Sequence, residues 1–247
     1  MKSIFISGAA QGIGRAVAER FLAEGWMVGA YDIAPVEYEH EHLITGLIDV
    51  RSPESWSAAL ADFAAHTGGT IDVVDNNAGI IVAGNIADLS PEQVKRQIDI
   101  NCTGVVLGAQ AAKPYLKRGS QLVNMSSASA TYGQPGIATY SASKFFVAGL
   151  TEGLSLEWAR DGIRVVAIWP LWARTNLANN SAASIKRLGV NITPEEVAET
   201  IWKATHPNLL TRGRIHWTVS TADTVLFYAR RLAPNRVARQ ITRLLAG

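Results

Sequence analysis

A tyrosine and a lysine stand four residues apart, at Tyr140 and Lys144, in a stretch with helical periodicity. Side chains at this spacing project from one face of a helix. A lysine ammonium beside a phenol favours the phenolate, so we expect it to lower the pKa of the tyrosine from its usual value of about 10. Such a tyrosine can serve as a general acid or base near neutral pH.

A serine accompanies this pair. Ser127 follows the apolar run Gln121–Met125 and precedes Tyr140 by thirteen residues. A hydroxyl at this place can hydrogen-bond a substrate oxygen while charge develops on it. The three side chains together indicate proton transfer at a substrate oxygen, whereas a tyrosine–lysine pair alone is usually an ordinary surface pair.

A glycine-rich turn lies near the start of the chain. The apolar run Ile4–Ser7 passes into Gly8, Gly12 and Gly14, and a helical pattern follows. Glycines let the backbone turn tightly and approach a pyrophosphate, whose charge the amides at the helix start can bind. A plain tight turn is the alternative, but the strand before it and the helix after it favour a dinucleotide site.

Asp32 ends the second apolar run, eighteen residues after Gly14. A carboxylate there can accept hydrogen bonds from the adenosine ribose. It would repel a 2′-phosphate by roughly 4 kcal/mol at about 4 Å and an effective dielectric constant near 20. Arg15 is the nearby cation and is expected to face away along its helix. The sequence therefore favours NAD(H), and an NADP-linked reductase is the alternative if Arg15 swings toward the phosphate.

The elements that must position these residues alternate in type. Seven short apolar runs are predicted to be strands: Ile4–Ser7, Met27–Tyr31, Leu43–Ile48, Ile71–Asp75, Gln121–Met125, Arg164–Trp169 and Ile215–Val219. The first six have so few polar alternations that we expect them to be covered on both faces. Helical patterns lie between them: Gly14–Glu24, Pro53–His66, Pro91–Leu116 and Thr139–Asp161. This alternation predicts an α/β fold with a doubly wound parallel sheet, in a single domain over residues 1–247.

Composition excludes several other classes of protein. The chain of 247 residues is 48% hydrophobic and 18% charged, which excludes disorder. A net charge of +2 gives no reason to expect a nucleic-acid partner. The single cysteine, Cys102, excludes an internal disulfide and a cysteine-based metal site, and no metal is expected. No apolar run reaches the roughly 18 residues that span a bilayer, so we expect a cytoplasmic protein.

The C-terminal segment, residues 223–247, has a different character. It holds five arginines against one acid, Asp223. Val237, Ile241, Leu244 and Leu245 recur at helical spacing and predict one apolar face. We expect this helical tail to dock on its own body or on a partner subunit, and a basic helix lying on a membrane surface is the alternative.

Several motifs, in this order, resemble those of the short-chain dehydrogenase/reductase family: Ser7–Gly14, Asp49-Val50, Asn76–Gly79, Asn101, Ser127 and Tyr140–Lys144. The resemblance covers about residues 1–205. It implies a single Rossmann domain with a seven-stranded parallel sheet. It also implies an oxidoreductase that transfers a hydride between a nicotinamide cofactor and an alcohol or carbonyl.

The resemblance further implies roles for individual residues. Tyr140 would be the acid/base, Lys144 would also hold the nicotinamide ribose, Ser127 would orient the substrate oxygen, and Asn101 would position a water in a proton relay. Asn101 could instead satisfy buried backbone groups. The cofactor would contact Gly8, Gln11, Gly12, Ile13, Gly14, Asp32, Asp49, Val50, Asn77, Ala78, Gly79, Tyr140, Lys144, Pro170 and Thr175.

The residues expected around the substrate are mostly apolar or neutral: Ser127, Ser129, Gln134, Ile137, Leu171, Trp172 and the stretch from Asn176 to Val190. They favour an apolar or neutral alcohol, diol or ketone. Leu171 replaces the family's usual glycine, which bears on the size of the pocket. The helices that carry Asn101 and Tyr140 form the family's common dimer interface, so the resemblance implies a homodimer or homotetramer. A catalytically silent dinucleotide-binding regulator is the alternative function.

Overall fold

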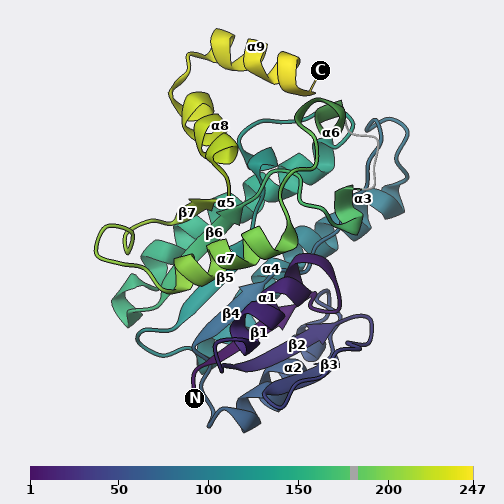
Figure 1. Cartoon of the computed structure of the whole chain (residues 1–247). Coiled ribbons are helices and arrows are strands. Elements are labelled where there is room, and N and C mark those ends of the chain that lie inside the picture. The colour runs from purple at the N-terminus through teal and green to yellow at the C-terminus, as the bar shows by residue number, and fades with distance from the viewer. Residues whose placement is uncertain (179–182, 247) are drawn as a thin grey trace.

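The computed structural model describes residues 1–178 and 183–246, and seven strands in it form one parallel sheet (Figure 1). The strand order is β3-β2-β1-β4-β5-β6-β7. The strands are β1 (Ser3–Ser7), β2 (Met27–Asp32), β3 (Leu43–Leu47), β4 (Val73–Asn76), β5 (Gln121–Met125), β6 (Arg164–Trp169) and β7 (His216–Thr218). This confirms the predicted doubly wound fold. Its order reverses between β1 and β4, where sheets of this type open a crevice for a ligand.

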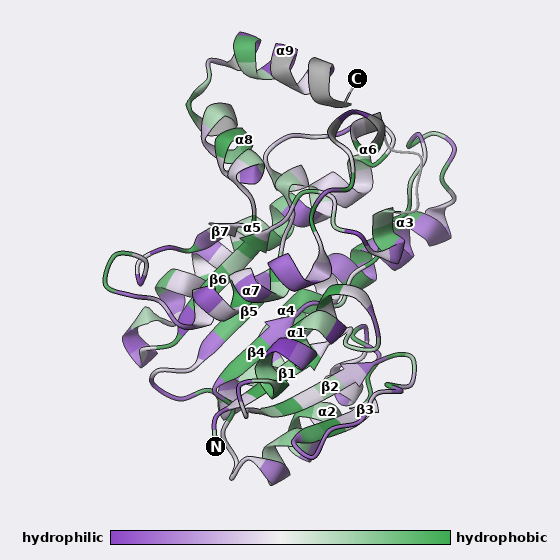
Figure 2. Ribbon diagram, viewed as in Figure 1, coloured by the Kyte–Doolittle hydropathy of each residue, from purple (hydrophilic) through white to green (hydrophobic). Residues whose placement is uncertain are grey.

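Helices cover both faces of the sheet. One face packs against α1 (Gly12–Leu22) and α7 (Pro194–Thr205), and the other against α2 (Pro53–His66), α4 (Gly104–Ala112) and α5 (Ala138–Glu157). Figure 2 shows the mainly hydrophobic colouring of β1 and β6 between these layers. The double cover explains why these strands lack polar alternation.

Two sequence-based expectations were wrong in detail. Strand β3 is not covered on both faces: it lies at the edge of the sheet, and Leu47 is 67% exposed. The helix expected over residues 91–116 is interrupted. It consists of α3 (Pro91–Ile98), a π-helical turn (Asp99–Thr103), α4 and a final 3-10 turn. Such π-helical turns occur frequently at functional sites.

The C-terminal segment forms α8 (Thr221–Leu232) and α9 (Asn235–Ala246), which extend beyond the sheet in Figure 1. Helix α9 lies against α6 (Ala183–Leu188), where Arg187 Nη1 donates to the carbonyl oxygen of Arg243 at 2.9 Å. Val237, on the predicted apolar face, is 47% exposed, and the neighbouring Ala238 is buried. The side chains of Ile241, Leu244 and Leu245 lie outside the described residues. In the part of the chain that is described, no helix has the length and apolar character needed to cross a membrane.

Candidate active site

A cavity of about 750 Å³ opens where β1, β2, β4, β5 and β6 end. Most of the residues predicted for the site line it: Gly8, Gln11, Gly12, Ile13, Asp32, Asp49, Val50, Asn77, Ala78, Gly79, Ser127, Ser129, Gln134, Tyr140, Lys144, Pro170, Leu171, Trp172 and Thr175. The fold therefore brings the expected cofactor, catalytic and substrate residues to one place. Three of the residues predicted individually do not line the cavity: Gly14, Asn101 and Ile137. Of the predicted stretch 176–190, residues 176–178 line the cavity, the described side chains of residues 183–190 do not, and residues 179–182 lie outside the described residues.

The glycine-rich turn has the geometry of a phosphate cradle. Gly8 and Gly12 have φ of 72° and 59°, a left-handed conformation that favours glycine. Gly14 is buried beneath the turn. Only glycine fits there, because a Cβ atom would collide with the carbonyl oxygen of Gly8. The Gln11 side chain makes no capping bond to α1 and instead accepts from Asn176 Nδ2 at 2.8 Å. The first-turn N–H groups of α1 are thus left for an anionic ligand, which fits a dinucleotide pyrophosphate.

The carboxylate of Asp32 is fixed at the end of β2. It accepts backbone N–H groups of Ala10 at 2.9 Å and Ala34 at 3.1 Å. Arg15 does not face away from the site as expected, since it lines the same cavity. Its Nε is nevertheless paired with Glu19 Oε1 at 2.8 Å. The negative charge of Asp32 is therefore held in place, while the nearest expected cation is engaged elsewhere.

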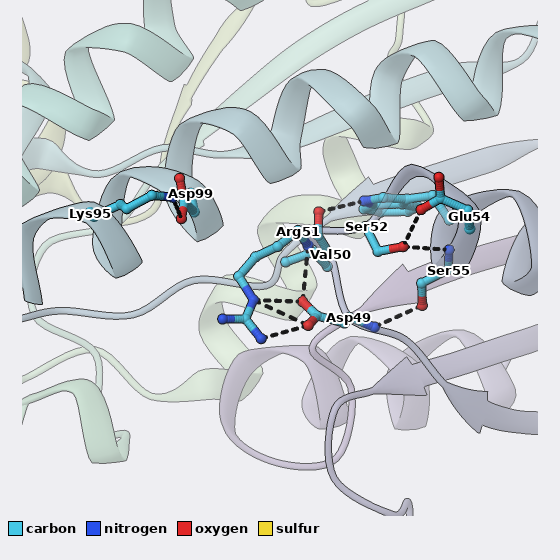
Figure 3. Close-up of polar contacts among 9 residues, drawn as sticks. Asp49, Val50, Arg51, Ser52, Glu54, Ser55, Lys95 and Asp99 are labelled. Carbon is cyan, nitrogen blue, oxygen red and sulfur yellow. Dashed lines mark hydrogen bonds and ion pairs between the residues drawn. The ribbon is translucent and has the colours of Figure 1, made fainter. Parts of the chain in front are cut away.

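Asp49, which the family resemblance places near the adenine, is bound by a neighbouring arginine (Figure 3). Arg51 Nε lies 2.8 Å from Asp49 Oδ1, and Arg51 Nη2 lies 2.6 Å from Oδ2. These bonds hold the pKa of the Asp49 carboxyl below its usual range. The pair keeps Asp49 ionised at this edge of the cavity.

Tyr140 and Lys144 face the cavity from the first turns of α5 and are almost fully buried. Lys144 Nζ lies 5.6 Å from the centre of the Tyr140 ring. Burial raises the pKa of Tyr140 to about 12 and outweighs the lowering from a hydrogen bond with Ser127. Burial also lowers the pKa of Lys144 to about 8. The expected lowering of the tyrosine pKa is therefore wrong for this arrangement, because desolvation of the phenolate is the larger effect.

Ser127 follows β5 and points its hydroxyl at the site. Its Oγ accepts the backbone N–H of Ser129 at 3.1 Å and lies 3.0 Å from Ser129 Oγ. Its Oγ also lies 3.4 Å from the carbonyl oxygen of Pro170. These contacts hold the hydroxyl near the phenol of Tyr140, whose pKa it acts to lower.

The Asn101 side chain lies behind the cavity, within the π-helical turn. Its Oδ1 accepts from Ile80 N at 2.9 Å, and its Nδ2 donates to Ile80 O at 2.8 Å and to Ser143 Oγ at 3.1 Å. The amide thus binds the buried backbone of Ile80 and the Ser143 side chain of α5, and a relay role for Asn101 stays a prediction. The amide supports the segment that follows Gly79.

The substrate end of the cavity is built by the turn after β6 and by the loop before α5. Ile137 lies beneath Tyr140 and packs against it. One residue was missed at the sequence level. Asp223, 1% exposed at the start of α8, accepts from Leu171 N at 3.4 Å and anchors that turn. Ser184, within the stretch expected around the substrate, bonds both Gln134 and Trp172.

Comparisons with known proteins agree with this arrangement. Residues 2–186 match the family model for short chain dehydrogenase. The chain is 35% identical over 215 residues to oxidoreductase UcpA of Escherichia coli K12, covering 82% of this chain and 80% of that protein. It is 32% identical over 212 residues to meso-2,3-butanediol dehydrogenase of Serratia marcescens, covering 80% and 84%.

Solved structures share the fold. A 3-ketoacyl-(acyl-carrier-protein) reductase from Brucella melitensis, complexed with NADH, matches with a TM-score of 0.78 and 25% identity over 88% of this chain and 96% of that one. A short chain dehydrogenase from Burkholderia cenocepacia, in complex with NADP, matches with a TM-score of 0.84 and 22% identity over the whole of both chains. With the family match over residues 2–186 and the site described above, the chain belongs to the short-chain dehydrogenase/reductase family, oxidoreductases that act on alcohol or carbonyl groups with a nicotinamide dinucleotide.

Proposed function

We propose that this chain transfers a hydride between NAD(H) and a neutral secondary alcohol or ketone. The observation that carries the proposal is that Tyr140, Ser127 and Lys144 line the same cavity as the glycine-rich turn and Asp32. The nicotinamide, when bound, supplies or accepts the hydride. The protein must then deliver or remove one proton at the substrate oxygen.

Tyr140 moves that proton in the proposed mechanism. Its raised pKa keeps the phenol protonated at neutral pH, so it is ready to donate to the oxygen of a ketone. The Ser127 hydroxyl binds the same oxygen as negative charge develops on it. The Lys144 ammonium, held nearby, stabilises the phenolate left after the proton has moved. In alcohol oxidation the proton returns from the substrate hydroxyl to Tyr140.

The preference for NAD(H) over NADP(H) rests on Asp32. A 2′-phosphate would meet its fixed carboxylate, while Glu19 holds Arg15. The two charges repel by roughly 4 kcal/mol at about 4 Å and an effective dielectric constant near 20. Because Arg15 lines the cavity, an NADP-linked reaction is the second candidate.

The neutral substrate class rests on the walls of the cavity. Leu171 and Trp172 contribute apolar surface, and Ser129 and Gln134 contribute neutral polar groups. The nearby cation Arg174 donates from Nε to the carbonyl oxygen of Val190 at 3.1 Å. The Lys186 side chain lies outside the described residues. The butanediol dehydrogenase among the relatives acts, by its name, on a molecule of this class.

We also infer that the chain assembles as a homodimer or larger homo-oligomer through α5. Phe145 and Phe146 are 45% and 44% exposed on this helix, and Leu156 is 77% exposed. Exposed apolar side chains grouped on one helix are typical of a protein interface. Sedimentation of the wild-type chain against a Phe145→Ser, Phe146→Ser variant tests this, and an unchanged sedimentation coefficient contradicts it.

The decisive experiment measures NADH formation from NAD across a panel of secondary alcohols and diols, with Tyr140→Phe beside the wild type. We expect the variant to lose at least roughly 100-fold in kcat, since proton transfer then lacks its general base. Tyr132→Phe is the matched control, because this buried tyrosine lies outside the cavity lining and its hydroxyl has no hydrogen-bond partner among the described residues. Equal turnover by both variants contradicts the role of Tyr140, and binding of NADH without any turnover favours a silent dinucleotide-binding protein.

A further inference from the structure

Three hydrogen-bonded side chains form the polar wall of the substrate end. Trp172 Nε1 donates to Ser184 Oγ at 3.1 Å, and Ser184 Oγ donates to Gln134 Oε1 at 2.6 Å. Trp172 and Gln134 line the cavity, whereas Ser184 lies behind them and is 1% exposed. The turn after β6, helix α6 and the loop before α5 supply one member each.

The chemistry of the three groups sets the direction of these bonds. An indole N–H can only donate, so Ser184 must accept from Trp172. The serine proton then satisfies a second buried group if it goes to Gln134. The Gln134 amide therefore turns its oxygen toward Ser184 and its NH₂ group away from it.

The Gln134 amide nitrogen is left with two donors for a ligand. Gln134 is only 4% exposed, and within residues 1–178 and 183–246 no group accepts a hydrogen bond from its Nε2. Its exposed part faces the cavity that Tyr140 and Ser127 also line. A substrate that covers this amide without supplying an acceptor leaves the donor unpaired, which costs free energy, whereas a substrate oxygen at this place satisfies it.

We propose that Gln134 Nε2 recognises a second, neutral oxygen of the substrate, and that Ser184 is the positioning residue that aims it. The preferred substrates are accordingly diols and hydroxy ketones rather than simple monofunctional alcohols and ketones. This rests on the proposed function, since it names the substrate class of that same site. A polar site of this kind discriminates because the substrate that lacks the oxygen leaves the amide unpaired.

The test compares kcat/KM for pairs of substrates with one carbon skeleton: 2,3-butanediol with 2-butanol, 2,4-pentanediol with 2-pentanol, and 1,2-cyclohexanediol with cyclohexanol. The wild type should favour the diol in at least one pair by roughly tenfold or more. Gln134→Leu keeps the bulk but has no donor, and should reduce the diol-to-monool ratio by about the same factor. Gln134→Glu keeps an oxygen for Ser184 but places acceptors toward the substrate, and should reduce the ratio at least as far.

Ser184 is tested through the same ratio. Ser184→Ala frees the amide to rotate and should lower the ratio several-fold, whereas Ser184→Thr retains the hydroxyl and should restore it. Tyr132→Phe, on the same loop as Gln134 but outside the cavity lining, should leave both rates unchanged. A ratio that stays constant in Gln134→Leu overturns the recognition, and one that stays constant in Ser184→Ala overturns the positioning role. Turnover of monools and diols at equal rates refutes this inference alone, whereas no turnover of any substrate refutes the proposed function with it.

Discussion

The Lys144 ammonium donates a hydrogen bond to the carbonyl oxygen of Met125 at 2.8 Å. This bond ties helix α5, which carries Tyr140, to the last residue of β5, so the ammonium has a fixed place near the phenol. Burial of the amine lowers its pKa to about 8. Lys144 is therefore still charged in most molecules at neutral pH. The positive charge is therefore held where a phenolate can form.

Removing this charge should slow the reaction in both directions. In Lys144→Met the side chain keeps its length and apolar stem, but the Tyr140 phenolate loses its neighbouring cation. We expect kcat to fall by roughly 100-fold, as for loss of a general acid–base group. The melting temperature should stay the same or rise, since a buried amine is replaced by an apolar group. A kcat within a few-fold of the wild type contradicts the role assigned to Lys144.

The raised pKa of Tyr140 predicts opposite pH dependences for the two directions. Ketone reduction needs the protonated phenol, which predominates at all pH values below about 12. Alcohol oxidation needs the phenolate, whose fraction grows with each unit of pH toward that value. Plots of kcat/KM against pH should therefore be flat for reduction near neutrality and rise with pH for oxidation up to about pH 8, above which Lys144 loses its charge. An oxidation rate already constant from pH 6 to 8 shows that the tyrosine pKa is low in the working enzyme.

Exchange of Asp32 should change cofactor choice. Asp32→Ser removes the negative charge while a hydroxyl remains for the Ala10 amide, so we expect affinity for NADPH to rise at least tenfold relative to NADH. Glu19→Gln is the informative partner variant, because it frees Arg15 without touching Asp32. Fluorescence titration with both cofactors measures the ratios. If the wild type already binds both equally, Asp32 does not select the cofactor.

Much of the fold could be predicted because the strands are apolar enough to be recognised one at a time. The predicted bounds of β5 and β6 agree with the structure. The error at β3 arose because an edge position depends on the order of strands, which composition does not reveal. The π-helical turn at Asn101 was missed for a similar reason, since it depends on bonds to Ile80 and Ser143 across the fold.

The candidate site could be predicted where local motifs carry it and not where tertiary packing does. The glycine-rich turn and the Tyr140–Lys144 spacing are local. The shift in the Tyr140 pKa depends instead on burial, which a single sequence does not state. Ser184 meets Gln134 across 50 positions of the chain, so no spacing rule could have linked them.

A buried carboxyl in β4 offers a test of stability. Asp75 is fully buried, and neither of its carboxyl oxygens has a hydrogen-bond partner among the described residues. Its neighbours in the register are Ile6 of β1 and Val123 of β5. Burial alone raises its pKa to about 8. The residue therefore stays protonated at neutral pH, in a place where an apolar side chain would pack better.

Asp75→Val should raise the free energy of unfolding, and by more as the pH rises. Between about pH 4, where an unfolded aspartate titrates, and about pH 8, the folded wild type holds one more proton than the unfolded chain. Its stability therefore falls with pH in this window, by at most about 1.4 kcal/mol per unit, and the valine variant lacks this slope. Urea unfolding of both proteins at pH 5, 6, 7 and 8 measures the difference, which cancels contributions from the other titrating groups. Asp75→Asn is the control for shape, since it removes the titration but keeps a buried polar group. A stability difference between wild type and Asp75→Val that stays constant across these four pH values means that Asp75 does not titrate with a raised pKa in the folded protein.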